Sequence, residues 1–164
     1  MYSNLLELAR GKLSEAEASL GTALRLQPCL AEAYLNLADL GRQRGDEVAA
    51  ERAIRAALAC NPQNAAAHHA LGLWQVRAGQ SNAAMASLRK AVDLAPADPR
   101  FSYVLAVALA GSGDRDEAIG LLETMLKNRP NDAMALHTLA GYLRDAGQTE
   151  RAAKARQELD TLLR

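Results

Sequence analysis

Residues 31–64, AEAYLNLADLGRQRGDEVAAERAIRAALACNPQN, decide the fold of this 164-residue chain. The first half carries an apolar stripe at the spacing of one helical face, made of Tyr34, Leu37, Ala38 and Gly41. A second stripe follows Gly45 and consists of Ala50, Ile54, Ala57 and Leu58. Gly45 favours the left-handed turn that ends a helix, and the residue before Pro62 is pushed out of the α region. The stretch therefore predicts a helical hairpin.

The same pattern recurs along the whole chain with a period of 34 residues. The ladders are Gly11, Gly45, Gly79, Gly113 and Gly147, and Pro28, Pro62, Pro96 and Pro130. They predict a single array of a truncated repeat at 1–30, full repeats at 31–64, 65–98 and 99–132, and a terminal repeat at 133–164. In the first of these we expect a shortened helix around Leu5 to Leu8 and a second helix from Ser14 to Leu26, with Ser14 and Glu17 capping its start.

At these ladder positions the chain resembles the tetratricopeptide repeat (TPR) family, whose pattern combines large apolar residues, small residues and a late proline at this period. The resemblance implies an all-α fold, a right-handed superhelical solenoid of antiparallel helical hairpins. Turns are expected at Gly45, Gly79, Gly113 and Gly147. No strand is expected, even in the uncharged run from Phe101 to Ala110.

Composition and charge narrow the functional classes. Lys plus Arg number 19 and Asp plus Glu number 19, with both signs interspersed, so the clustered basic surface of a nucleic-acid-binding protein is missing. No stretch is long and apolar enough to predict a membrane span. Cys29 and Cys60 do not form a C-x-x-C motif, and we interpret both as free, partly buried thiols.

Catalytic and metal-binding patterns are also missing from the sequence. It contains none of the common motifs for metalloprotease zinc, for phosphate loops or for a serine nucleophile. His68 and His69 are adjacent on an expected helix and so point in different directions, which disfavours a shared metal. Trp74 has the helical spacing of a core residue. We expect no catalytic residues, no metal and no cofactor.

The resemblance implies that the first helices of successive repeats line a binding groove. In this chain its apolar centre and charged margins correspond to His69, Leu73, Val76, Arg77, Arg100, Tyr103, Val104, Val107, His137 and Arg144. An apolar centre with a polar rim is the arrangement of a recognition surface. The opposing interpretation is that the apolar residues only pack against neighbouring helices.

We interpret the chain as a bacterial, non-catalytic scaffold that binds a protein or peptide, with no nucleic-acid partner and no membrane insertion. The alternative is an assembly or regulatory segment of a larger enzyme, because residues 65–80 and 95–109 loosely resemble the terminal repeats of bacterial multihaem cytochrome-like proteins. Self-association through the truncated N-terminal end is a further expectation. The sequence assigns no compartment: cytoplasm is the default, and the periplasm stays open if the chain belongs to a longer exported protein.

Overall fold

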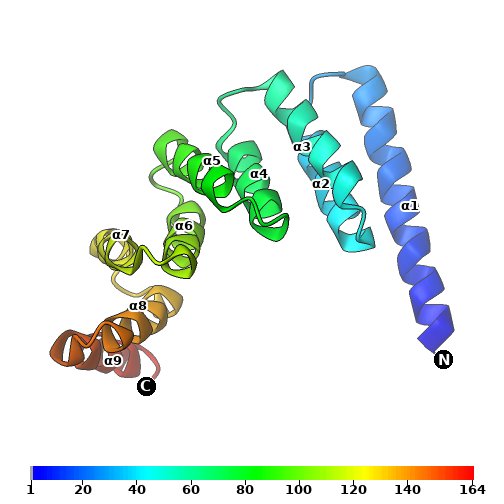
Figure 1. Cartoon of the computed structure of the whole chain (residues 1–164). Helices are drawn as coiled ribbons and strands as arrows, with labels where there is room; N and C mark the ends of the chain where they lie inside the picture. Colours follow the sequence, from blue (N-terminus) through cyan, green and yellow to red (C-terminus); the bar gives the residue numbers. More distant parts are fainter. Residues whose placement is uncertain (1) are drawn as a thin grey trace. The chain divides into compact units, whose positions relative to one another are not determined.

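The computed structural model describes the backbone of residues 2–164 and the side chains of residues 11–164. It consists of two compact units, Met1–Gln80 and Ser81–Arg164. The first unit contains α1 (Tyr2–Leu26), α2 (Ala31–Arg44), α3 (Glu47–Cys60) and α4 (Ala65–Arg77) (Figure 1). Within this unit α2 and α3 form a hairpin, and α4 packs on α3.

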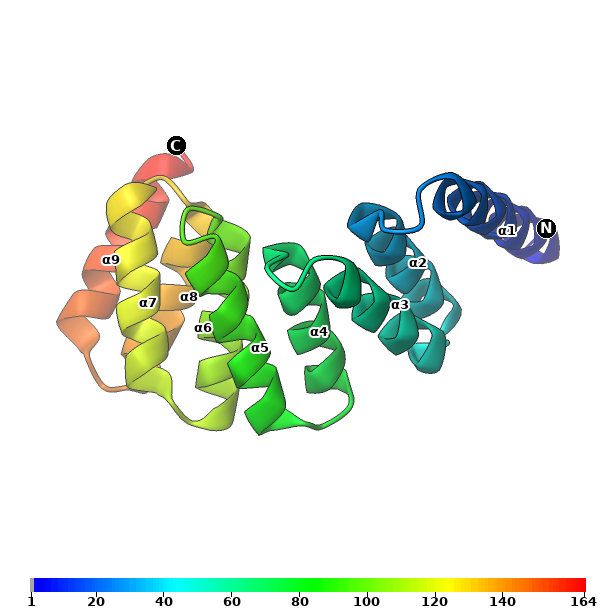
Figure 2. The ribbon, with the colours of Figure 1, turned by 90° about the horizontal axis from the view of Figure 1, so that it is seen from above.

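The second unit contains α5 (Ser81–Leu94), α6 (Pro99–Ser112), α7 (Arg115–Asn128), α8 (Ala133–Asp145) and α9 (Thr149–Leu162). The hairpins α6–α7 and α8–α9 pack side by side through α7 and α8 (Figure 2). Every element in the described residues is a helix, which confirms the predicted all-α fold of helical hairpins. The uncharged run from Phe101 to Ala110 lies inside α6.

Glycines on the 34-residue ladder close the first helix of each hairpin, as predicted. Gly45 and Gly113 have φ angles of 74° and 102°, in the left-handed region that favours glycine. The residue after each glycine is placed to begin the next helix. Asp46, for example, accepts a hydrogen bond from the Ala49 amide at 2.9 Å and so caps α3. Asp114 occupies the same position before α7, but its side chain makes no capping hydrogen bond.

The prediction of two helices in residues 1–30, one around Leu5 to Leu8 and one from Ser14 to Leu26, is wrong, because α1 runs unbroken from Tyr2 to Leu26. Ser14 consequently lies inside a helix and does not cap one. Lys12 after Gly11 has no side-chain oxygen with which to cap a new helix, unlike Asp46 after Gly45, so the local sequence does not favour a helix start there. The expected self-association through the N-terminal end involves residues whose side chains lie outside the described ones.

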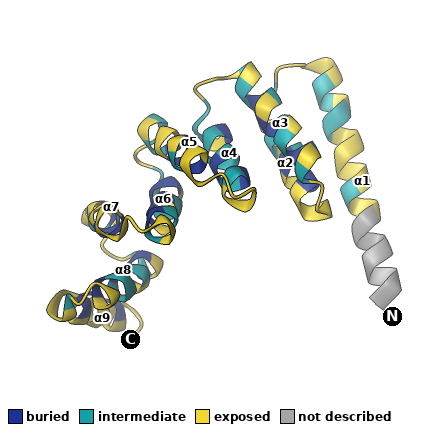
Figure 3. Cartoon of the chain, in the orientation of Figure 1, coloured by how far each residue is buried: buried dark blue, intermediate teal, exposed yellow. Residues whose placement is uncertain are grey.

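Each unit has its own apolar core (Figure 3). In the second unit one cluster joins all five helices, with Leu88, Leu109 and Leu122 fully buried. In the first unit Trp74 packs against α2 and α3, and its indole N–H donates to the Glu47 carbonyl at 3.0 Å. Trp74 is therefore a core residue, as its spacing predicted.

The interpretation of Cys29 and Cys60 as free thiols is wrong, because they form a disulfide with a Cα–Cα distance of 5.2 Å. Cys29 lies just before α2, and Cys60 is the last residue of α3. A helical hairpin returns the chain to the end where it began, so residues almost one period apart become neighbours. The disulfide therefore staples the α2–α3 hairpin at its open end. Within the described residues, no helix is both long and apolar enough to span a membrane.

Candidate functional site

The first helices of the last two hairpins, α6 and α8, are linked by their side chains. The hydroxyl of Tyr103 on α6 lies 3.0 Å from the Thr138 hydroxyl oxygen on α8. Tyr103 and Val104 are half-buried and pack on the core of the unit. This contact links α6 directly to α8.

We define a surface of these two helices, the α6–α8 face, by six residues: Arg100, Tyr103, Val104, Val107, His137 and Arg144. Its apolar part reaches solvent, since Val107 is 41% exposed; Met134, in the first turn of α8, is 62% exposed. The opposite side of α6 is core: Phe101, Leu105 and Leu109 are buried. The uncharged run from Phe101 to Ala110 thus has a buried side, which packs in the core, and an exposed apolar side.

The two arginines of the α6–α8 face are tied to nearby carboxylates. Arg100 donates to Asp98 at 2.7 Å, and its guanidinium lies 5.7 Å from the centre of the Phe101 ring. The hydrogen bond to Asp98 raises the pKa of Arg100. Arg144 contacts its neighbour Asp145 at 3.2 Å. Both arginines are largely exposed, so these contacts are weak and leave the guanidinium groups available to a partner.

The remaining predicted groove residues, His69, Leu73, Val76 and Arg77, lie on α4 in the first unit. Val76 is 48% exposed and Leu73 is half-buried. Arg77 is held by the Glu47 carboxylate of α3 at 2.9 Å, and this hydrogen bond lowers the pKa of Glu47. Arg77 therefore braces α4 against α3. The structure describes this set within its own unit and the α6–α8 face within the other.

Tyr142 on α8 is a member of this neighbourhood that the sequence did not single out. Burial raises its pKa, and Tyr103 adds to the effect. The Tyr103–Thr138 contact was also missed, although the two residues are nearly one period apart and both lie on first helices. That spacing was the signal that could have found it. Among the described residues no group of three or more His, Cys, Asp or Glu side chains is placed to hold a metal ion.

Comparison with known proteins identifies the repeats. The family model described as the cytochrome c-type biogenesis protein H TPR domain matches residues 50–164, and a tetratricopeptide repeat model matches residues 5–65. No curated protein sequence matches the chain.

Three solved structures show the same fold. A crystal structure of MamA has a TM-score of 0.80 at 19% identity, covering 95% of this chain and 91% of that one. PilF of Pseudomonas aeruginosa has a TM-score of 0.82 at 22% identity, covering 96% and 72%. YrrB, described as a TPR protein with an unusual peptide-binding site, has a TM-score of 0.73 at 23% identity, covering 98% and 82%.

Proposed function

Because the chain belongs to the family of the cytochrome c-type biogenesis protein H TPR domain, whose model covers residues 50–164, we propose that it is a non-catalytic binding module in the biogenesis of c-type cytochromes. TPR proteins bind other proteins through their helical surfaces, and this coarser function is common to the family. The partner proposed here is a polypeptide segment, extended or helical. The polypeptide that such a process must handle is the cytochrome chain itself.

The observation that carries the proposal is the α6–α8 face. Val107 and Met134 expose apolar surface on two helices that the Tyr103–Thr138 contact holds together. A rigid, partly apolar surface loses little conformational entropy when it binds. Arg100 and Arg144 stand near the two ends of the face, where a polar rim is expected. The peptide-binding description of YrrB, a protein of the same fold, adds support.

The disulfide indicates the kind of compartment in which the protein functions. Cross-links of this kind persist outside the reducing cytosol, in secreted proteins and in the bacterial periplasm. Cys29 is exposed, so a reducing environment would reach the disulfide. We therefore place the module in an oxidising compartment.

Site-specific photo-crosslinking tests the proposal. A photoreactive amino acid at Val107 should capture peptides that tile c-type cytochrome polypeptides, because this side chain stands exposed on the face. The matched control carries the same group at Lys127, an exposed residue of α7 outside the face. Equal capture at both positions, or no capture at Val107, would refute binding at the α6–α8 face.

A further inference from the structure

The last hairpin has an open cavity of about 500 Å³ between α8 and α9. Its floor is made of small or apolar residues: Ala140, Gly141, Ala152, Ala153 and Leu159. Leu163, at the edge of the cavity, is 72% exposed. We call this surface the end face. Its apolar area is exposed, because none of the described segments of this unit covers it.

The preceding hairpin shows what fits such a surface. One period earlier, Leu122 and Met125 of α7 take the places that Arg156 and Leu159 have in α9. There α8 covers them, and they are buried in one cluster with Ala135 and Leu139. The end face therefore has the backbone shape of a surface that receives a helix.

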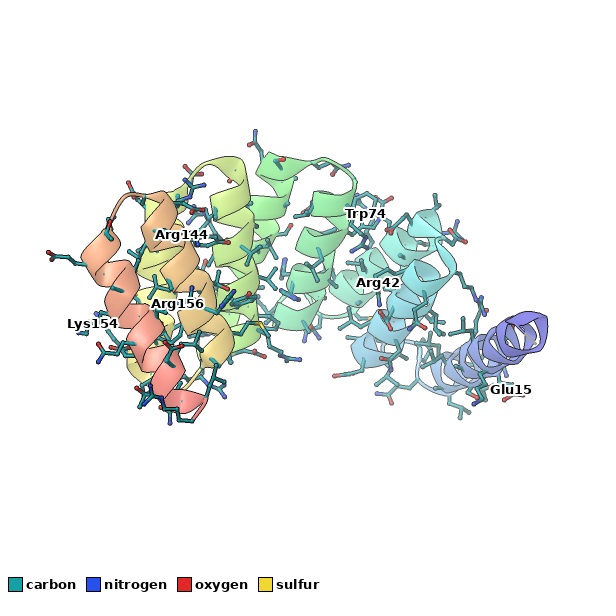
Figure 4. All side chains as sticks on the ribbon, turned by 90° about the horizontal axis from the view of Figure 1, so that it is seen from below. Glu15, Arg42, Trp74, Arg144, Lys154 and Arg156 are labelled. Atoms are coloured by element: carbon teal, nitrogen blue, oxygen red, sulfur yellow. A yellow bond between two sulfur atoms is a disulfide. The ribbon has the colours of Figure 1, made fainter. Side chains whose placement is uncertain are left out.

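Two charges distinguish the end face from its covered counterpart. Arg156 replaces Leu122, and Asp160 replaces Leu126. Arg151, elsewhere on α9, bonds to Glu123, whereas no ion pair among the described residues takes up Arg156 or Asp160. Figure 4 labels Arg156 on α9 together with Arg144 on α8. The patch thus carries apolar area and both signs of charge, each sign without a partner in the unit.

We propose that the end face docks the end face of a second copy of this chain. In a two-fold symmetric interface each residue of a patch meets the complementary residue of the same patch. Antiparallel crossing of the two α9 helices would set Arg156 of each copy against Asp160 of the other. Leu163 supplies the apolar side chain that enters the partner's cavity. His137 and Arg144 of the α6–α8 face also line this cavity, so the proposed interface adjoins that face and adds self-assembly to the proposed binding of a peptide.

A different occupant would leave a different signature. A helix from another protein needs only complementarity to Arg156, Asp160 and the apolar floor, and it gives no self-association. A second copy requires that the two charges match each other. The charge pattern favours the second copy, because Arg156 and Asp160 lie one helical turn apart on α9, and a two-fold axis between two antiparallel α9 helices would pair each with its opposite.

Charge reversal with sedimentation velocity tests this interface. The wild-type chain should form dimers as its concentration is raised, and Arg156→Asp and Asp160→Arg should each weaken the dimer by about tenfold or more through like-charge repulsion. The double variant Arg156→Asp/Asp160→Arg should restore it, because the reversed charges again face opposite ones. Lys154→Asp makes the same charge change on α9 outside the end face and should leave the dimer intact.

Each result has a defined meaning. The three substituted positions, Arg156, Asp160 and Lys154, are exposed on α9, so thermal unfolding should be unchanged and serves as the check on folding. A wild-type chain that stays monomeric at every concentration overturns the proposal. It is also overturned if the single reversals have no effect, if the double variant does not recover, or if Lys154→Asp is as disruptive as Arg156→Asp.

Discussion

The hydroxyl groups of Tyr103 and Thr138 lie 3.0 Å apart and join α6 to α8 across the boundary between two repeats. Either group can be the donor, so the contact is neutral and does not depend on salt. Because it connects the two helices that carry the α6–α8 face, it restrains their relative movement in the free protein. Binding then requires less ordering than it would on two independent helices.

Removing this hydrogen bond should cost stability without removing apolar area. Tyr103→Phe and Thr138→Val each delete one hydroxyl, and we expect each to lower the free energy of unfolding by about 0.5–1.5 kcal/mol. The double variant should cost clearly less than the sum, since both changes remove the same contact. Urea denaturation of the four proteins measures this. Strict additivity would show that the contact contributes nothing.

The disulfide between Cys29 and Cys60 should stabilise the first unit. It closes a segment with a sequence separation of 31, and cross-links of this size contribute about 2–4 kcal/mol by restricting the unfolded chain. Urea unfolding with and without a reductant should show this difference. The Cys29→Ser/Cys60→Ser variant should unfold at the same urea concentration as the reduced protein, and adding the reductant should not change its unfolding curve. Identical curves for oxidised and reduced wild type would contradict the prediction.

Gly41 permits the close approach of α2 to α3. A Cβ atom at this position would lie 2.9 Å from the Ala50 amide nitrogen, which is backbone and cannot rotate away. Gly41→Ala should therefore destabilise the protein by about 1–3 kcal/mol. Gly120 is an exposed residue of α7, and a Cβ atom there would meet nothing within 4 Å. Gly120→Ala should therefore stabilise the helix by about 0.5–1 kcal/mol. Thermal unfolding that shifts both variants in the same direction would exclude this steric explanation.

The sequence predicted the hairpins well because the turns are encoded locally. Gly45 and Gly113 each combine a positive φ with a following aspartate at the start of the next helix. Gly11 shares the spacing but lacks that second signal, and the helix continues through it. The period predicted where a turn would belong, but a following aspartate is not required for one, because Gly79 and Gly147 form the turn with glutamine after them.

Contacts between repeats were harder to predict. Cys29 and Cys60 were judged by their distance along the chain, although a hairpin brings residues at this separation together. Arg77 was assigned to a groove margin from its helix position, and only the structure places Glu47 within hydrogen-bonding distance. Ion pairs of long side chains depend on rotamers that the helical period does not specify.

The central claim, that the α6–α8 face binds a polypeptide partner, is tested most directly by comparing two exposed valines. Val107 is on the face and 41% exposed, whereas Val48 is 67% exposed on α3 in the other unit. The measurement is the affinity of a captured cytochrome-derived peptide for Val107→Asp and Val48→Asp, with unfolding curves to confirm that both variants are folded. We predict that Val107→Asp weakens binding by about tenfold or more, since it buries a charge in the apolar centre, and that Val48→Asp binds as wild type. Unchanged affinity of a folded Val107→Asp variant would contradict the account.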